Sequence, residues 1–208
     1  MNAVVSTITQ LLPAEIITTD PEQITLYSQD VFTVGPPICA VVRPRNIDEV
    51  QALVRACLER GTPIVTRGGG MSYTSGYIAN APDSVLIDMA SMDAIVEVNL
   101  EDRYVTVEAG CSWQKLYEHL APLGVRTAYW GTLSGRYATV GGGLSQNSIF
   151  WGSGQRGTAA DNVLSVSVVT GKGDLLETGS AAQQHAAPFT RHFGPDLTGV
   201  FLGDCGAL

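Results

Sequence analysis

The most constraining feature of this sequence is a strand, a helix and a second strand that runs into a glycine-rich loop. ICAVVRP reads as a β-strand stopped by Pro44, and TPIVTRGGG reads as another strand. Between them, NIDEVQALVRACLERG has Asn46 as N-cap, Glu49 three positions later, an apolar helical face and Gly61 at its end. Because helical crossovers join parallel strands, we predict a parallel β-α-β unit.

The pattern then changes to short strands and hairpins. SVLIDM predicts a further strand, AIVEVNLEDRYVTVEAG two strands joined at residues 99–102, and SWQKLYEHLAPLG a helix. DNVLSVSVVTGKGDLLETG predicts a hairpin, while residues 131–158 are rich in Gly, Ser and Thr without a periodic pattern. We expect an α+β fold of two α/β lobes, the second with a larger mixed sheet and flanking helices.

The expected domain boundaries follow these changes in pattern. Residues 1–34 lack sustained periodicity and read as an N-terminal arm with two short helices. Residues 35–208 then form one domain, with the first lobe at about 35–90 and the second at about 91–208.

Charge and cysteine content exclude several classes of function. The chain has 20 acidic and 12 basic residues, a formal net charge of -8, and no Lys or Arg before Arg43, which argues against nucleic-acid binding and a basic presequence. No apolar run is long enough to cross a bilayer. The four cysteines form no CxxC pair, which favours buried or inert free thiols and a cytoplasmic location.

Two glycine clusters, RGGGMSYTSG and TVGGGLSQ, are the main candidates for a binding site. Consecutive glycines after a strand let backbone N–H groups converge on a phosphate or pyrophosphate, and Ser72 and Thr74 add hydroxyl donors. A tight turn without a ligand is the alternative for one cluster alone. Two clusters predict two walls around one extended ligand. GSGQRG also matches GxGxxG, but it precedes a strand, so we interpret it as a loop coincidence.

Five segments in order carry a family resemblance: RPRNIDEVQALVRAC, RGGGMSYTSG, VEAGCSWQKLYEHL, ATVGGGLSQ and GTAADNVLSVSVVTGKGDLLETG. Together they resemble the PCMH-type FAD-binding domain of the vanillyl-alcohol oxidase and p-cresol methylhydroxylase superfamily, from about residue 35 onward. The resemblance implies FAD held between two lobes. The cofactor-binding residues that it implies are Arg67, Gly68, Gly69, Gly70, Met71, Ser72, Gly76, Tyr77, Thr132, Leu133, Ser134, Thr139, Gly141, Gly142, Ser145, Gly157, Asp161 and Asn162.

Several positions depart from the family pattern. Met71 stands where some members attach the flavin to a histidine, and Tyr137 stands where others use a cysteine, so the resemblance implies non-covalent FAD. Near the end, GDCGAL replaces the family's GSEGTLG, and we expect Cys205 to be a small buried filler.

The resemblance is strongest to the branch of D-lactate dehydrogenases and glycolate oxidase subunits, which implies hydride transfer from a 2-hydroxy acid to FAD. In that branch a cap domain beyond the equivalent of residue 208 supplies the acid–base groups, so we assign no catalytic residue and expect a cap domain or partner subunit to be needed. Phenolic or aryl-alcohol oxidation, and a non-catalytic flavin-binding module completed by another chain, are the alternatives.

Other polar and aromatic residues are weaker candidates. Of the three histidines, His119 is expected on a helix surface, and His185 and His192 lie in a loop sequence. Arg156 and Arg191 are possible anion contacts because a guanidinium pairs bidentately with a carboxylate or phosphate. Tyr129, Trp130 and Trp151 are expected either to line a flavin or substrate face or to belong to the core.

Overall fold

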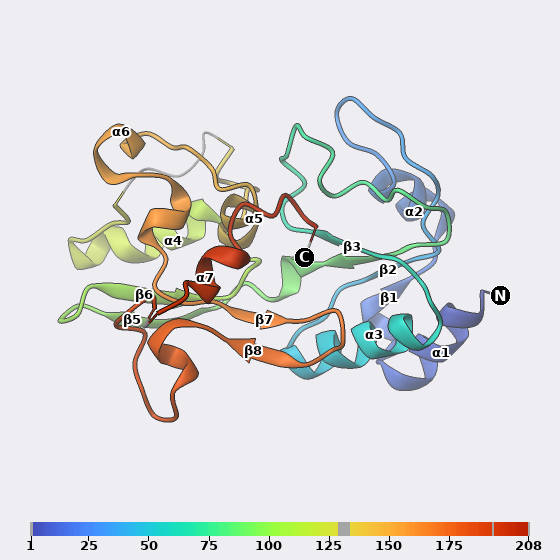
Figure 1. The fold of residues 1–208 in the computed structure, drawn as a ribbon. Coiled ribbons are helices and arrows are strands. Elements are labelled where there is room, and N and C mark those ends of the chain that lie inside the picture. Colours follow the sequence, from blue (N-terminus) through green and yellow to red (C-terminus); the bar gives the residue numbers. More distant parts are fainter. Residues whose placement is uncertain (1, 129–133, 193, 208) are drawn as a thin grey trace. The chain divides into compact units, whose positions relative to one another are not determined.

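The structure is a computed structural model that describes residues 2–128, 134–192 and 194–207. The chain divides into two compact units (Figure 1). Unit 1 comprises Met1–Met92 with Val169–Leu175, and unit 2 comprises Asp93–Val168 with Leu176–Leu208. Each unit is described by itself below.

Unit 1 is built on a four-stranded sheet in the order β1-β2-β4-β3. β2 and β3 each run parallel to β4, and β1 runs antiparallel to β2 at the edge. The predicted β-α-β unit is therefore confirmed, and β4 lies between the two strands that α3 connects. The elements of this unit are α1 (Ala3–Leu11), η1 (Ala14–Ile16), β1 (Ile17–Thr18), α2 (Pro21–Tyr27), β2 (Ala40–Val42), α3 (Ile47–Glu59), β3 (Ile64–Arg67), β4 (Val85–Asp88) and η2 (Met89–Ser91).

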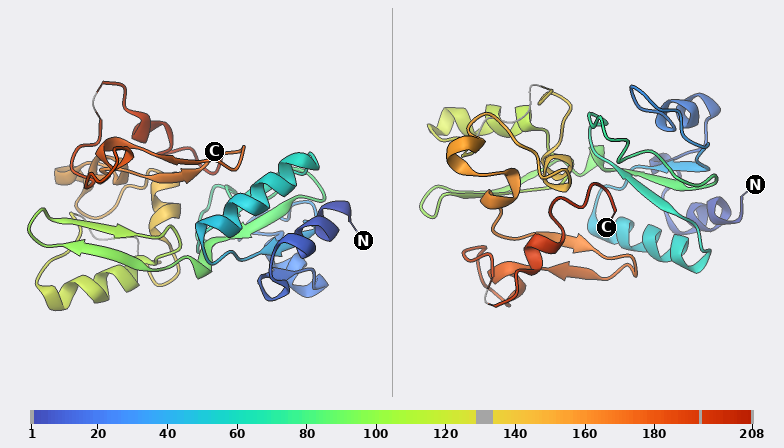
Figure 2. Two further views of the ribbon diagram at one scale, coloured as in Figure 1. Left: turned by 90° about the horizontal axis from the view of Figure 1, so that it is seen from below. Right: turned by 45° about the horizontal axis from the view of Figure 1, so that its top comes forward.

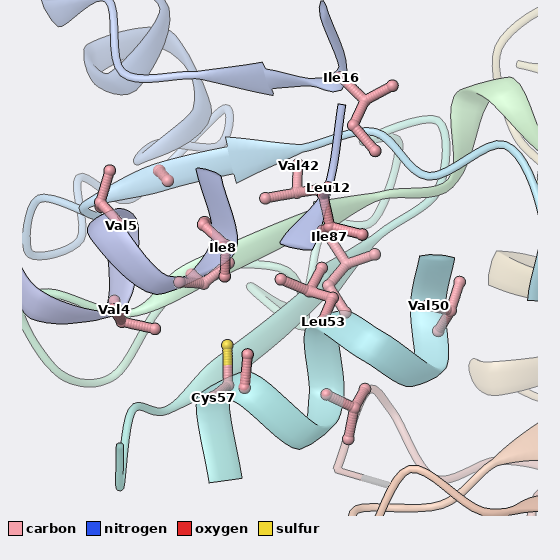
Figure 3. Packing of buried hydrophobic residues seen from close by; sticks show 14 of the residues in the cluster. Val4, Val5, Ile8, Leu12, Ile16, Val42, Val50, Leu53, Cys57 and Ile87 are labelled. Atoms are coloured by element: carbon pink, nitrogen blue, oxygen red, sulfur yellow. The ribbon is translucent and has the colours of Figure 1, made fainter. Parts of the chain in front are cut away.

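Both faces of this sheet are covered, because successive strand residues point to opposite sides. On one face, Val42 and Ile87 pack with Ile8 of α1 and Leu53 of α3, as Figure 3 shows. On the other face, Leu86 belongs to a second cluster that α2 helps to cover. Figure 1 shows α1 and α3 on one side of the sheet and α2 on the other, and the two views of Figure 2 agree.

The helix α3 begins and ends where its sequence predicts. The Asn46 side chain accepts a hydrogen bond from the Glu49 N–H at 2.9 Å, which satisfies a free donor of the first turn. Gly61 has φ +61° directly after the helix, a left-handed conformation that glycine adopts at low cost. The side chains of Gln51 and Arg55 donate to the Gly173 carbonyl at 2.7 Å, which holds the segment Val169–Leu175 of unit 1 against this helix.

The first 34 residues, which we expected as an arm, pack into unit 1. Val4 and Ile8 of α1 are buried in the same cluster as α3 (Figure 3). β1 pairs with β2, and the Arg43 N–H donates to the Ile16 carbonyl at 2.8 Å. The sequence of these residues lacks sustained periodicity, so it did not show that they would pack against the sheet of the β-α-β unit.

Unit 2 contains a β-hairpin with a helix packed against it. β5 and β6 are antiparallel, as predicted, and the Asn99 side chain accepts from the Asp102 N–H in their turn at 2.8 Å. Trp113, Leu116 and Leu120 of α4 pack against apolar residues of this hairpin. The elements are β5 (Ile95–Asn99), β6 (Tyr104–Val107), α4 (Trp113–Leu120), η3 (Ala121–Leu123), α5 (Val140–Ser145), α6 (Ser153–Arg156), η4 (Ala159–Asn162), β7 (Ser167–Val169), β8 (Leu175–Glu177), η5 (Gly179–Ala182) and α7 (Leu197–Val200).

The prediction that the second lobe holds the larger mixed sheet is wrong. Within the described ranges, β5 pairs with β6 and β7 pairs with β8 in separate two-stranded sheets, while the four-stranded sheet belongs to unit 1. Alternating apolar residues identify a strand but do not specify its partner. Here a short turn brings each strand to its neighbour in sequence, and that neighbour satisfies the backbone groups.

Candidate cofactor-binding site

The glycine loop of residues 68–76 follows directly from β3. Gly70 has φ +65°, a conformation that favours glycine. Within the described part of the chain, no backbone N–H of residues 68–72 donates a hydrogen bond. The hydroxyls of Ser72 and Thr74 lie 2.9 Å apart at the end of this run. Adjacent unpaired donors on a backbone with few side chains suit an oxygen-rich anion such as a pyrophosphate.

Arg67, the last residue of β3, lies against this loop. Its guanidinium carbon is 4.5 Å from the ring centroid of Tyr27 and 5.2 Å from that of Tyr77. The Nε atom is buried, with no hydrogen-bond partner among the described residues. In the same part of the chain, no carboxylate lies within ion-pair distance of Arg67. The unpaired N–H donors of the loop therefore fit the diphosphate of FAD, and the positive charge of Arg67 lies beside them.

Two side chains hold the loop from its far end. The Tyr77 hydroxyl donates to the Gly70 carbonyl at 2.8 Å, and burial raises the pKa of Tyr77. The Ser75 hydroxyl donates to Asp30 Oδ2 at 2.8 Å, while Asp30 Oδ1 accepts from the backbone N–H of Phe32 at 2.7 Å. The Phe32 and Ser75 hydrogen bonds lower the pKa of the Asp30 carboxyl. Tyr77 was predicted at this site, and Asp30 was not.

Tyr27 is a second residue beside this loop that the sequence did not indicate. Its hydroxyl donates to Oδ2 of the buried Asp88 at 2.9 Å, and the Nη2 of Arg43 donates to both groups. Burial, followed by the hydrogen bond to Asp88, raises the pKa of Tyr27. Tyr27 precedes the glycine loop by about forty positions and lies in the expected arm, so no local pattern connects it with Arg67.

The second glycine cluster, residues 139–146, lies in unit 2 and is hydrogen-bonded internally. Thr139 caps α5, its hydroxyl accepting from the Gly142 N–H at 3.2 Å. The Gly141 N–H donates to the Ala109 carbonyl at 2.9 Å, and a Cβ added at Gly141 would meet that carbonyl oxygen at 2.8 Å. An added Cβ at Gly143 would meet the Trp113 ring at 3.1 Å. Close packing thus explains Gly141 and Gly143 without a ligand.

The segment 157–162 packs against α5 within unit 2. Gly157 has φ +80° and lies against Asp161. Asp161 Oδ2 accepts from the N–H and the hydroxyl of Thr158 at 2.6 and 2.9 Å, which lowers the pKa of that carboxyl. The Asn162 side-chain amide donates to the Arg156 and Thr158 carbonyls. These predicted site residues therefore form one capped turn.

The remaining predicted site residues are dispersed. Thr132 and Leu133 lie outside the described residues. The Ser134 carbonyl accepts from the N–H groups of Tyr137 and Ala138 at 2.9 Å in a turn before α5. Ser145 binds the chain end, since its carbonyl accepts from the Cys205 N–H at 2.8 Å and its hydroxyl from the Gly206 N–H at 3.0 Å.

The two arginines proposed as weaker candidates for an anion contact differ in whether their guanidinium groups are already paired. Arg191 pairs with Asp196 at 2.8 Å and donates to the Ala160 carbonyl, so it is occupied inside unit 2 rather than available to an anion. Arg156 is exposed at the end of α6, and Trp151 is 71% exposed and does not belong to the core. GSGQRG forms a turn with the four-residue α6, and among the described residues no β-strand leads directly into it, as a dinucleotide fingerprint requires.

The four cysteines differ in their burial. Cys57 and Cys111 are buried, and burial raises the pKa of Cys57 to about 12 and that of the half-buried Cys39 to about 11. The expectation that Cys205 is a buried filler is wrong, because Cys205 is exposed on a chain end with φ +55°.

Across the described residues there is no cluster of possible metal ligands, and no helix is long and apolar enough to span a membrane.

The sequence of this chain matches a known protein family. Residues 38–179 match the family model described as FAD binding domain. The chain is 34% identical over 168 residues to "D-lactate dehydrogenase [cytochrome], mitochondrial" of Arabidopsis thaliana, covering 81% of this chain and 28% of that protein. It is 30% identical over 169 residues to "Glycolate oxidase subunit GlcD" of Bacillus subtilis, covering 81% of this chain and 34% of that protein.

The fold of this chain is also similar to that of a solved flavoprotein. The structure of p-cresol methylhydroxylase superposes with a TM-score of 0.81 at 21% identity, covering 96% of this chain and 40% of that one. This chain thus spans about a third of the length of the curated relatives named above. The family match over most of the chain shows that it belongs to the FAD binding domain family, and its fold is the one seen in p-cresol methylhydroxylase.

Proposed function

We propose that this chain binds FAD without a covalent bond and forms the cofactor domain of an oxidoreductase that acts on 2-hydroxy acids. The observation that carries the cofactor proposal is the glycine loop, where the N–H groups of residues 68–72 are unpaired beside Arg67. These N–H groups, with the Ser72 hydroxyl, would hold the diphosphate. Gly76 and Tyr77 would lie beside them.

The proposed non-covalent attachment rests on residue chemistry. Met71 and Tyr137 stand at the two positions where relatives are expected to carry a histidine or a cysteine. A methionine thioether has no nitrogen or thiol with which to form either bond, and Tyr137 offers a phenol instead. We therefore expect that acid or denaturant releases all of the flavin.

The proposed substrate class rests on the relatives named as acting on D-lactate and glycolate. When bound, FAD supplies a hydride acceptor for a carbon that carries a hydroxyl group. Oxidation also needs a base for the hydroxyl proton. We propose that residues outside this chain supply this base and the carboxylate-binding groups, because the match covers only 28% and 34% of the two relatives. They would belong to a further domain or to a partner subunit.

The cofactor proposal is tested by mixing the purified chain with FAD, removing free flavin on a desalting column and recording the visible absorbance. Acid precipitation then separates bound from covalent flavin. We expect retained flavin that moves to the acid supernatant. Flavin left in the pellet would refute non-covalent attachment, and a folded chain that retains no flavin would count against the cofactor proposal.

The substrate proposal needs protein that includes the further domain. Anaerobic addition of D-lactate or glycolate should bleach the flavin absorbance, because the oxidised flavin is consumed. p-Cresol serves as the comparison, since a phenol oxidase of the same fold would bleach with the phenol instead. Bleaching by p-cresol alone would overturn the 2-hydroxy acid proposal.

A further inference from the structure

Arg67 lies between two tyrosine rings that come from different parts of unit 1. Tyr27 is the last residue of α2, and Tyr77 follows the glycine loop. The Arg67 guanidinium carbon lies 4.5 Å from one ring centroid and 5.2 Å from the other. A planar cation within about 6 Å of an aromatic ring is attracted to the ring, and arginine stacks better than lysine because its charge is planar.

Gly70 lies directly against this stacked guanidinium. A Cβ at Gly70 would collide with the Nη2, Nε and Cζ atoms of Arg67. The Tyr77 hydroxyl donates to the Gly70 carbonyl at 2.8 Å, so Tyr77 contacts both the cation and the loop. The position of Gly70 is therefore set from two sides by Arg67 and Tyr77.

The first tyrosine is held in place by the sheet. Asp88 ends β4 beside Arg67 in the register of the parallel pair, and it is 3% exposed. The Tyr27 hydroxyl donates to Asp88 at 2.9 Å, and Arg43 donates to Asp88 at 2.8 Å. A chain of contacts thus runs from the end of β4 through Tyr27 and Arg67 to Gly70.

We propose that Tyr27, Arg67 and Tyr77 form a clamp that keeps the glycine loop in shape, so that the N–H groups of residues 68–72 stay unpaired and ready for an anion. In this proposal Arg67 is a positioning residue rather than a ligand of the cofactor, because its planar group lies against two rings. The proposal rests on the proposed function, in which this loop receives the FAD diphosphate.

The loop itself is measured first, on the chain without flavin. Backbone ¹⁵N order parameters report the rigidity of residues 68–72, and the Arg67 Nε–H resonance reports ring stacking. We expect a rigid loop and a ring-shifted Nε–H signal. Tyr27→Leu and Arg67→Lys should lower the order parameters, to below about 0.6 where the loop becomes flexible. Tyr27→Phe, which keeps the ring, should change them less.

Tyr73→Leu is the matched control, since Tyr73 lies on the same loop but is 68% exposed and contacts the Phe32 ring instead of Arg67. It should leave the loop signals unchanged. Unchanged order parameters in Tyr27→Leu, or a fully rigid loop in Arg67→Lys, would overturn the clamp.

Affinity for FAD is measured next by fluorescence titration. Tyr27→Leu and Arg67→Lys should each weaken FAD binding by about 2- to 30-fold, the range that follows from the loss of one cation–π contact. ADP, which also carries a diphosphate, should lose affinity by the same factor. If Arg67→Lys bound FAD as tightly as the parent chain, the charge alone would be sufficient. That result would indicate a direct contact with the cofactor and would overturn the positioning role.

The two proposals fail in different ways. If the unaltered chain bound neither FAD nor ADP, the proposed function would fail, and the order parameters alone would still decide whether the clamp exists. If the variants loosened the loop while FAD affinity stayed the same, the cofactor proposal would stand and the clamp's role in binding would be refuted.

Discussion

The loop at residues 68–72 of unit 1 and the segment at residues 139–146 of unit 2 have similar glycine-rich sequences but different hydrogen bonding. Within the described residues, the N–H groups of the first are unpaired. In the second, the Gly141 and Gly142 N–H groups donate to Ala109 and Thr139. Glycine therefore accompanies unpaired backbone donors in one place and close packing in the other, and the sequence alone does not distinguish the two.

The largest effect is expected from Gly141→Ala. The new Cβ would meet the carbonyl oxygen and the Cβ of Ala109 at 2.8 Å, and backbone cannot move aside easily. We expect a loss of about 3 kcal/mol in the free energy of unfolding, measured by urea unfolding with tryptophan fluorescence. Gly154→Ala is the control, because open space surrounds Gly154. An equal loss in both variants would contradict the packing role.

A smaller loss of stability is expected from Gly70→Ala, with a loss of FAD affinity in addition. The variant adds a left-handed alanine and displaces the Arg67 guanidinium, for about 2 kcal/mol in total. Gly61→Ala is the matched control, since Gly61 has φ +61° but nothing within 4 Å, and it should cost about 1 kcal/mol. Thermal unfolding, followed by circular dichroism, compares the stabilities of the two variants. In an FAD titration, only Gly70→Ala should lose affinity. Equal affinities would argue against a ligand-binding role for the loop.

Thr139→Ala tests the internal hydrogen bonding of the second segment. It removes the acceptor of the Gly142 N–H at the start of α5, and loss of such a cap costs about 1 kcal/mol. Thr139→Ser keeps the hydroxyl and should retain most of the stability. Urea unfolding measures both, and a Thr139→Ala variant as stable as the parent would show that the cap is not needed.

The smallest effect is expected from Asp161→Asn, and it depends on pH. The Thr158 donors hold the pKa of Asp161 below its ordinary value of 3.8. A lowered pKa means that the charged carboxylate stabilises the fold above that ordinary value, and the contribution disappears as the pH falls through the folded pKa. The variant should therefore have a lower melting temperature than the parent at pH 7. The difference between the two melting temperatures should disappear in acid. Glu101→Gln, at an exposed carboxyl in the β5–β6 turn, is the control. A gap independent of pH would exclude the ionised carboxylate as the cause.

Much of the candidate site could be predicted from the sequence because its elements carry local signals. Asn46 and Gly61 mark the ends of α3, and the alternating residues of β5 and β6 mark a hairpin. The glycines of residues 68–70 follow a strand, which is the setting of a phosphate loop. Each of these signals depends only on neighbouring residues and on backbone geometry.

Other features could not be predicted because they depend on residues that are distant in sequence. Tyr27 lies near Arg67 because α2 packs on the sheet, where Asp88 of β4 is paired with Arg67 and accepts from the Tyr27 hydroxyl. Arg191 is not available to an anion, because it forms an ion pair with Asp196 and donates a hydrogen bond to the Ala160 carbonyl.

The sequence by itself determined the β-α-β unit, the hairpins and the family, since each is specified by short-range pattern or by an ordered set of motifs. Only the tertiary structure decided that β4 lies between β2 and β3, that α1 shares a core with α3, and that one glycine cluster is packed while the other has unpaired donors. The physical reason is that burial and hydrogen-bond partners are properties of the assembled chain, whereas strand and helix signals are properties of its segments.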